Sequence, residues 1–72
     1  KNYHVIAGAF IEKSNAEKLN NSLIESNFNS EILFSENGYH RVSYNSFESK
    51  ENAIIELEKL KRINKSAWIL TN

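Results

Sequence analysis

The sequence predicts an α+β domain whose elements follow the order β-α-β-β-α-β. The first observation is an internal repeat: Val5 and Val42, like Leu23 and Leu60, stand 37 positions apart, and the segments between them align at that offset. The second is Asn37-Gly38, the strongest hairpin-turn signal in the chain. Right-handed β-α-β crossovers joined by a hairpin give a ferredoxin-like, or RNP-like, βαββαβ fold. We therefore expect a four-stranded antiparallel sheet, in strand order 4-1-3-2, with two helices on one face.

The repeat covers a strand, a loop and a helix in each half of the chain. Residues Tyr3-His4-Val5, Phe10, Asn15-Ala16 and Leu23 return as Tyr39-His40-Arg41-Val42, Phe47, Asn52-Ala53 and Leu60, and only the tyrosines need a one-residue slip. An internal repeat of this kind in a short domain suggests two βα units related by a pseudo-twofold axis. Both copies of the strand then lie near the centre of one sheet.

The first strand is expected from Tyr3 to Phe10, and a helix follows it. Within the strand, Gly8 marks a bulge or a close approach of the backbone. Ser14 and Glu17 fit a capping box, in which Ser14 caps the start of the helix. The buried stripe of this helix is expected to consist of Ala16, Leu19, Leu23 and Ile24.

The first helix is expected to stop at Asn27, and a hairpin of two strands comes next. Asn27 tolerates the left-handed conformation that ends many helices, which places Phe28 against Leu23. The second strand is expected over residues 30–35 and the third from Tyr39 to about Asn45, on either side of the hairpin turn.

The second helix is expected from about Lys50 to Arg62, with Ser49 as its cap. Its inward-facing residues are expected to be Ala53, Leu57 and Leu60. Residues 67–71 then form the closing strand. No proline interrupts any of these elements, and no low-complexity linker divides the chain.

Composition limits the class of protein. The chain of 72 residues makes one domain, assigned to residues 1–72, and its nine basic and nine acidic side chains leave no net charge. That balance argues mildly against nucleic acid as the main partner. The absence of cysteine excludes disulfides and thiolate metal sites. No apolar run reaches membrane-spanning length, and a start at Lys1 suggests a fragment of a longer protein.

Catalytic chemistry has little support in the sequence. His4 and His40 are the only histidines, and alternation along the strands places them on opposite faces, so they neither pair nor chelate a metal. No two carboxylates can be placed across a cleft as glycoside hydrolysis requires. No phosphate-binding Gly-rich loop and no nucleophile-elbow motif occur. The sequence therefore predicts a binding protein that is not an enzyme and needs no cofactor or metal.

A function is expected on the face of the sheet that the helices leave open. If Val5 and Val42 face the helices, alternation sends their neighbours to the open face. The outward-facing set is then His4, Ile6, Tyr39, Arg41, Ser43 and Trp68. By the same rule His40 turns toward the helices. The pattern Ile32-Leu33-Phe34 does not decide which of its side chains faces outward.

The open-face set has the chemistry of a ligand-binding surface. Aromatic rings on a flat sheet stack on the apolar face of a sugar or on a base, and Arg41 supplies a rigid fork of hydrogen-bond donors. The alternative is that Tyr39 and Trp68 only complete a thin core. That alternative fits Arg41 less well, because a charged residue at the centre of a sheet has no helix to pack under on the open side.

At this point the chain resembles a known family, the SPOR domains, which are small bacterial modules that bind peptidoglycan. The resemblance covers nearly all of the sequence, and the order and spacing of its motifs are more specific than any one of them. The matching segments are Tyr3-His4-Val5-Ile6-Ala7-Gly8-Ala9-Phe10, Asn15-Ala16, Asn27-Phe28, Gly38-Tyr39-His40-Arg41-Val42 and Ala67-Trp68-Ile69-Leu70. The chain departs from the family pattern at Ile6, Ala9 and Asn45, where a glutamine, a small polar residue and a glycine are frequent.

The resemblance implies a non-catalytic module that binds glycan strands stripped of stem peptides on the helix-free face. It implies that Tyr39 and Arg41 are important for that binding. It also implies a location in the bacterial cell envelope, in the periplasm and at the division septum, where the module localises a larger parent protein. Peptidoglycan glycan strands are then the partner, with no nucleic acid, and any membrane attachment belongs to the rest of the parent protein.

Two other functions stay open from the sequence. RNA recognition motifs share this order of elements and stack bases on the same face. Against an RNA-binding domain, residues 40–44 lack the Gly/aromatic pattern of such motifs, and the net charge is zero. The second is a protein-interaction module, in which apolar Ile6 and Trp68 mark a partner or self-association surface.

Overall fold

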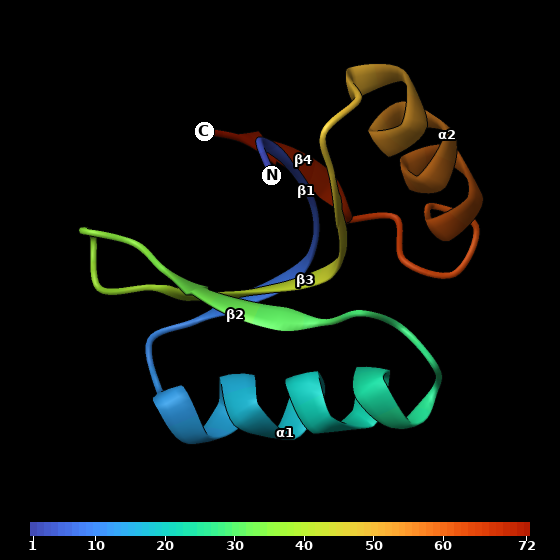
Figure 1. Ribbon diagram of the computed structural model, residues 1–72. Coiled ribbons are helices and arrows are strands. Elements are labelled where there is room, and N and C mark those ends of the chain that lie inside the picture. The colour runs from blue at the N-terminus through green and yellow to red at the C-terminus, as the bar shows by residue number, and fades with distance from the viewer.

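A four-stranded sheet backed by two helices forms in the predicted order of elements. The computed structural model describes all 72 residues. It contains β1 (Tyr3–Phe10), α1 (Lys13–Glu25), β2 (Glu31–Phe34), β3 (His40–Phe47), α2 (Lys50–Leu60) and β4 (Trp68–Thr71). The strands are antiparallel in the order β2-β3-β1-β4, and both helices cover the same, convex side of a bent sheet (Figure 1). The predicted ferredoxin-like fold and its strand order are confirmed.

The internal repeat extends over the whole sheet, beyond the segments in which the sequence shows it. Glu31 on β2 pairs with Ser43, and 37 positions away Trp68 on β4 pairs with Ile6. Every other Cα pair between β2 and β3 also has its counterpart between β4 and β1 at that offset. Ile6 and Ser43 pair with each other, and each is the counterpart of the other at the offset of 37 residues. The pseudo-twofold axis therefore passes between these two residues.

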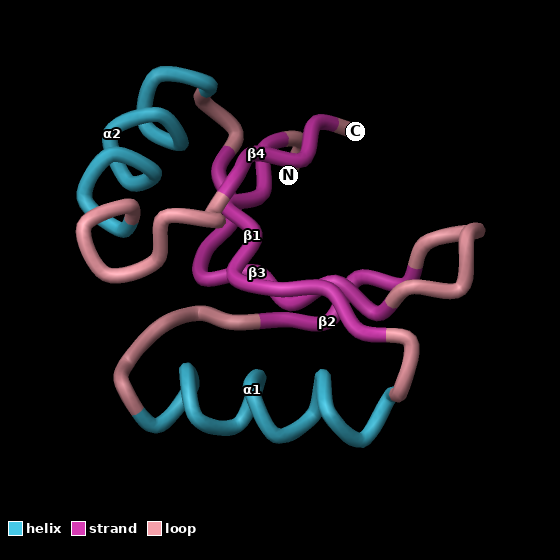
Figure 2. Tube along the Cα trace, turned by 180° about the vertical axis from the view of Figure 1, so that it is seen from behind, coloured by secondary structure: helices cyan, strands magenta, loops and turns pink.

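Two β-bulges flank the axis and bend the sheet. The register of β1 against β3 skips Tyr44 on one side of the Ile6–Ser43 pair and Ala7 on the other, and these two residues are again 37 positions apart. Both side chains pack with the core on the helix side. A bulge bends its strand and increases the local twist. The helix-free face is consequently concave (Figure 2), and not flat as the sequence suggested.

Gly8 and its counterpart Asn45 follow the bulged residues and face the helices. A Cβ at Gly8 would stand 3.2 Å from the Phe10 ring and 3.3 Å from Leu19 of α1, so the predicted bulge is also a close approach. Asn45 uses its larger side chain instead, because its Oδ1 accepts from the backbone N–H of Asn29 at 3.0 Å. Its Nδ2 donates to the α2 carboxylate of Glu56 at 2.6 Å.

The core fills the space between the convex side of the sheet and the helices. Its buried members are Val5, Ala16, Leu23, Val42, Tyr44, Ala53, Leu60 and Ala67. The prediction that Leu23 and Leu60 are equivalent and buried is confirmed. The prediction for Ile24 is wrong, because its side chain is 50% exposed. One residue along a helix turns the side chain by about 100°, and Leu23 already occupies the contact with the sheet.

The ends of α1 fit the prediction at one terminus only. The predicted Ser14 cap is wrong: the N-cap is Glu12, which makes no side-chain cap, and its carbonyl accepts from the N–H groups of Asn15 and Ala16. At the other end Asn27 has a left-handed φ of 73°. The Phe28 N–H donates to the Leu23 carbonyl at 3.0 Å, and the Asn27 N–H to that of Ile24 at 3.0 Å. This is the predicted Schellman ending.

The second half of the chain keeps its predicted elements with shifted ends. Ser49 caps α2 as predicted, because its Oγ accepts from the Asn52 N–H at 3.3 Å. The helix ends at Leu60 and not at Arg62. The hairpin is confirmed as a three-residue loop, in which the Ser35 N–H donates to the Tyr39 carbonyl at 2.8 Å. Each strand except β1 also starts or ends one or two residues from its predicted bounds.

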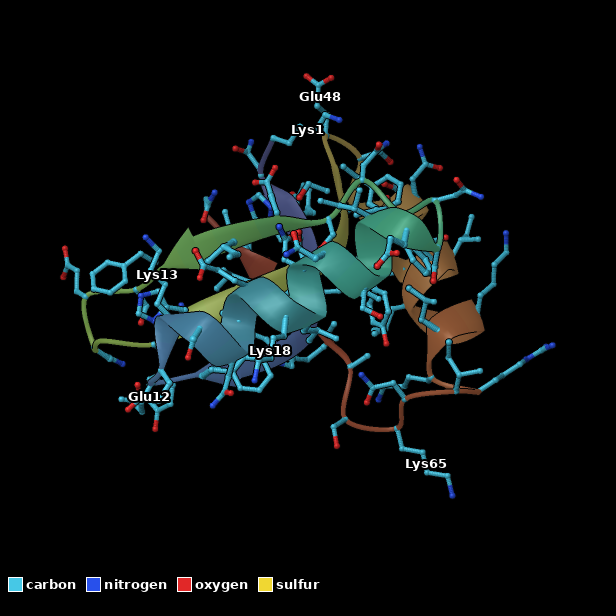
Figure 3. The ribbon with its side chains drawn as sticks, turned by 90° about the horizontal axis from the view of Figure 1, so that it is seen from below. Lys1, Glu12, Lys13, Lys18, Glu48 and Lys65 are labelled. Carbon is cyan, nitrogen blue, oxygen red and sulfur yellow. The ribbon has the colours of Figure 1, made fainter.

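Charged side chains are spread around the molecule. Figure 3 shows the labelled side chains projecting outward from several sides, and they are those of Lys1, Glu12, Lys13, Lys18, Glu48 and Lys65. All seven lysines of the chain are exposed. Because basic and acidic residues are mixed among them, no basic stripe of the kind that follows a nucleic-acid backbone is formed by these residues.

The two core leucines provide a test of the fold. Replacing Leu23 or Leu60 by Ala should lower the free energy of unfolding by about 2–5 kcal/mol, because each change leaves a cavity in a small core. Ile24→Ala is the matched control on the same helix, and it should cost far less because half of that side chain is already exposed. Thermal or urea unfolding measures the difference. Equal losses in all three variants would show that the two leucines have no special place in the core.

Candidate functional site

The concave face is built from side chains of all four strands. The register places Glu31, Ser43, Ile6 and Trp68 in one row across the sheet, in the order β2-β3-β1-β4. A neighbouring row holds Leu33 and Arg41, and another holds Ser46, His4 and Leu70. Sequence reasoning left Leu33 and Phe34 undecided. Leu33 belongs to the concave face, and Phe34 is on the other side with His40, whose ring lies 5.1 Å away.

The six residues predicted to form the site fall into two groups by exposure. Tyr39 is 41% exposed, Trp68 is 39% exposed and Arg41 is half-buried. Ile6 and Ser43 have no exposed surface, and His4 is almost fully buried. The exposed group has surface to offer a ligand in this conformation, whereas the buried group forms the floor and one wall of the face.

A cation–π contact, which we call the Arg41–Trp68 bridge, crosses the concave face. The Arg41 guanidinium carbon lies 5.6 Å from the centre of the Trp68 ring. These residues belong to β3 and β4, with β1 between them, so the contact spans β1. Such contacts contribute about 0.5–1 kcal/mol at exposed sites and more where water is excluded. The bridge holds a guanidinium and an aromatic ring together on a surface that no helix covers.

The bridge accounts for the burial of Ile6 and Ser43 on a helix-free face. Ile6 pairs directly with Trp68, and Ser43 lies two residues from Arg41 on the same side of β3. The long side chains of Arg41 and Trp68 therefore lie over the shorter side chains of Ile6 and Ser43 at the pseudo-twofold axis. The Ser43 hydroxyl donates to the Glu31 carbonyl at 3.4 Å, so this buried polar group has a partner. The residues beneath the bridge are therefore shielded from solvent, and the buried hydroxyl among them has a hydrogen-bond partner.

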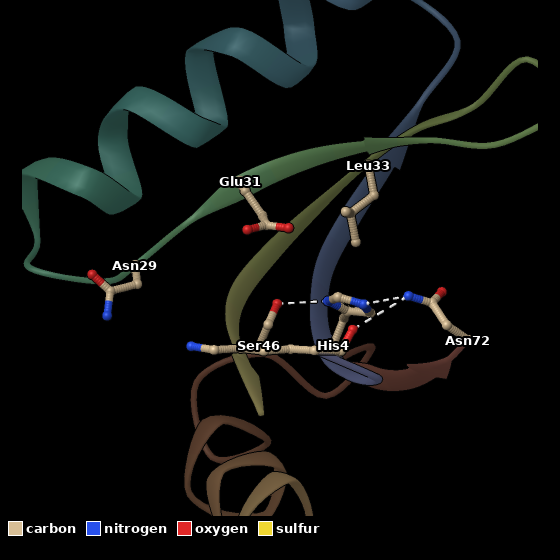
Figure 4. Close-up of a pocket in the computed structure, with 7 residues that line it drawn as sticks. His4, Asn29, Glu31, Leu33, Ser46 and Asn72 are labelled. Carbon is tan, nitrogen blue, oxygen red and sulfur yellow. Dashed lines mark hydrogen bonds between the residues drawn. The ribbon is translucent and has the colours of Figure 1, made fainter. Parts of the chain in front are cut away.

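His4 is held on the concave face by two hydrogen bonds (Figure 4). Its Nε2 lies 2.9 Å from Asn72 Nδ2, which can only donate, so Nε2 accepts. The Asn72 amide is oriented by a second bond, to the Lys1 carbonyl at 3.4 Å. His4 Nδ1 then carries the proton and donates to Ser46 Oγ at 2.6 Å. In this arrangement His4 fixes the orientation of the Ser46 hydroxyl.

A half-open pocket of about 520 Å³ lies in the concave face beside His4. Figure 4 shows Glu31 and Leu33 projecting from β2 toward His4 and Ser46. The lining is polar apart from Leu33, and it comprises Lys1, His4, Asn29, Glu31, Leu33, Ser46 and Asn72. Only His4 among these was predicted from the sequence. Ser46 was missed because strict alternation from Ser43 places Asn45 on this face, whereas the bulge at Tyr44 reverses the alternation.

The face offers no site for metal chemistry. No group of three or more His, Asp or Glu side chains is arranged to hold a metal ion. His40 lies on the helix side of β3, where its Nδ1 is 3.3 Å from the Phe10 carbonyl, while His4 lies on the concave side. No helix has both the length and the apolar character needed to cross a membrane.

Comparison with known proteins gives one match. A family model described as "SPOR domain" matches residues 1–71, which is nearly the whole chain. No curated protein and no solved structure matches the chain.

Trp68 is the only tryptophan, so its fluorescence tests the Arg41–Trp68 bridge directly. Arg41→Ala removes the guanidinium from above the ring and should expose it to water. The emission maximum should move to longer wavelength, and quenching by acrylamide should increase. Arg62→Ala removes the only other arginine, which is exposed beyond α2, and should change neither signal. Unchanged emission and quenching in Arg41→Ala would show that the bridge does not exist in solution.

Proposed function

The chain belongs to the SPOR domain family of non-catalytic, peptidoglycan-binding modules of the cell envelope, and we propose that it binds glycan strands denuded of stem peptides on its concave face. The contacts are made by Tyr39, Arg41 and Trp68. Ile6 and Ser43 support them from below. His4 shapes the adjoining wall.

The observation that carries this proposal is the Arg41–Trp68 bridge. An indole ring that is 39% exposed can stack on the apolar face of a pyranose, and the bridge fixes its position. The guanidinium beside it presents several donors in a rigid plane, which suits carboxylate and amide oxygens. A sugar ring on Trp68 therefore brings its polar substituents within reach of Arg41. Alternation from Arg41 turns the exposed Tyr39, which directly precedes β3, toward the same surface.

The preference for denuded strands follows from the charge of Arg41 and the shape of the face. An amidase hydrolyses the amide bond between the stem peptide and the lactyl group of N-acetylmuramic acid, and the lactyl group keeps a free carboxylate. Arg41 can form a charge-assisted pair with that carboxylate, which the intact amide cannot offer. A concave face also has less room for a peptide branch than an open one. Both effects favour the bare strand.

The same preference supports localisation to the division septum. A module that requires strands without stem peptides gathers wherever amidases expose them, and the family resemblance implies that this place is the division septum. In this proposal residues 1–72 act as a single targeting domain of a longer envelope protein, and the partner is the glycan strand.

RNA binding and protein binding have weaker support on this face. The lysines are exposed but spread over several sides of the molecule, and the net charge is zero, so there is little to follow a phosphate backbone. Ile6 was the apolar residue proposed to mark a protein partner, but it is 0% exposed and offers no contact surface. Trp68 alone is a small apolar area for a stable protein interface.

Sedimentation with purified sacculi tests the proposal. The domain should bind amidase-treated sacculi more strongly than untreated ones. Arg41→Ala should weaken that binding roughly tenfold or more, because a hydrogen bond to a charged group contributes about 1.5–3 kcal/mol. Tyr39→Ala should weaken it by loss of stacking surface. Circular dichroism should show that both variants remain folded.

Two control variants separate the concave face from the rest of the molecule. His40→Ala lies one residue from Arg41 on β3 but on the helix side, and Arg62→Ala removes an exposed arginine that follows α2. Both should bind like the parent. If folded Arg41→Ala and Tyr39→Ala also bind like the parent, the site is elsewhere. If the parent ignores sacculi and retards single-stranded RNA instead, the RNA-binding function replaces this one.

A further inference from the structure

A polar pocket lies in the concave face beside His4, which belongs to the other half of the pseudo-twofold repeat from Arg41. Resting on that function, we propose that the pocket around Glu31, His4 and Ser46 is a second subsite, which takes the uncharged sugar ring next to the ring held at Arg41. The ligand class is a neutral hexosamine ring bearing hydroxyl and acetamido groups, as in N-acetylglucosamine.

The two subsites are pseudo-twofold copies whose side chains have diverged. At the offset of 37 residues His4 corresponds to Arg41, and Glu31 corresponds to Trp68. The same backbone arrangement thus carries a guanidinium and an indole on one side of the axis, and an imidazole and a carboxylate on the other. A twofold surface with identical halves would suit a symmetric ligand, whereas a glycan strand has a direction and two alternating sugars. The divergence fits such a strand.

The subsites adjoin closely enough for neighbouring rings of one strand. Glu31 pairs with Ser43, and Arg41 lies two residues before Ser43 on β3, so Glu31 and Arg41 are diagonal neighbours. Diagonal positions on antiparallel strands are about 7–8 Å apart. No element separates them on the concave side. A chain leaving Arg41 along this diagonal enters the pocket directly.

The charges that line the pocket balance each other. The Glu31 carboxylate repels an anion and attracts a cation, and the Lys1 ammonium, which also lines the pocket, does the reverse, so neither sign of charge on the sugar gains a net advantage. A ring with hydroxyl and acetamido groups meets no like charge. It can donate to the Glu31 carboxylate and accept from Lys1. The volume of about 520 Å³ is within the range of small-molecule sites.

The hydrogen-bond chain at His4 prepares a donor for this ligand. Because Asn72 donates to Nε2, His4 donates through Nδ1 to Ser46 Oγ. The Ser46 hydroxyl hydrogen is then not used toward His4 and is available to the pocket. An acetamido carbonyl or a ring hydroxyl is the matching acceptor. The nearly buried His4 thereby acts as a positioning residue that orients Ser46.

NMR titrations with N-acetylmuramic acid and with a denuded tetrasaccharide test the second subsite. The monosaccharide should perturb amide signals near Arg41 and Trp68, and the tetrasaccharide should also perturb those of Glu31, Leu33 and Ser46. Glu31→Ala should weaken binding of the tetrasaccharide about three- to tenfold and leave binding of the monosaccharide unchanged. Glu31→Gln, which keeps an acceptor oxygen, should lose less. Glu58→Ala, on the exposed side of α2, should have no effect.

The outcomes separate this inference from the function on which it rests. If Glu31→Ala binds the tetrasaccharide like the parent while Arg41→Ala does not, the second subsite is overturned and the glycan-binding function stands. If Glu31→Gln loses as much as Glu31→Ala, charge and not hydrogen bonding governs the pocket, and a neutral ring is the wrong ligand. If the parent binds neither saccharide, both proposals fall together.

Discussion

The geometry of this domain depends on two β-bulges placed symmetrically about the Ile6–Ser43 pair. Each bulge turns an additional side chain, Ala7 or Tyr44, toward the helices. The core gains apolar contacts there, and the opposite face of the sheet becomes a hollow. In a flat sheet of the same order, the side chains of β3 and β4 would stand farther apart on the open side. The bend tilts these side chains toward each other over β1, where Arg41 and Trp68 are in contact.

The burial of Ile6 changes the meaning of a departure from the family pattern. A glutamine, frequent here in the family, would bring an amide to the centre of the concave face. Ile6 instead packs with no exposed surface in the row that ends at Trp68. An apolar floor without unpaired polar groups excludes water from beneath the bridge, and electrostatic contacts are stronger where water is excluded. In the proposed function, glycan affinity then rests more on Arg41 and the aromatic rings than on an amide of the floor.

Much of the fold could be predicted because local signals and the repeat agree with each other. The repeat and the hairpin signal gave the strand order, and Asn27 and Ser49 marked helix ends through their own backbone and side-chain chemistry. The errors have physical causes. Ser14 was a plausible cap, but the helix starts two residues earlier, where Glu12 has the extended backbone of an N-cap. Ile24 was assigned to the buried stripe of α1, but that stripe is narrower than expected and leaves the Ile24 side chain half exposed.

The candidate site was harder to predict, because alternation fails at a bulge and says nothing of contacts between strands. Ser46 reaches the concave face only through the irregularity at Tyr44. Gly8 indicated a bulge in the first half of the chain. The same bulge at the equivalent position Asn45 would have indicated that alternation reverses before Ser46.

The most direct measurement is a crystal structure with a denuded glycan oligomer. The sugar should lie in the hollow, with a ring on Trp68 and its lactyl carboxylate against Arg41. A glycan bound along the helices or the outer edge of β2, with the hollow empty, would contradict this account.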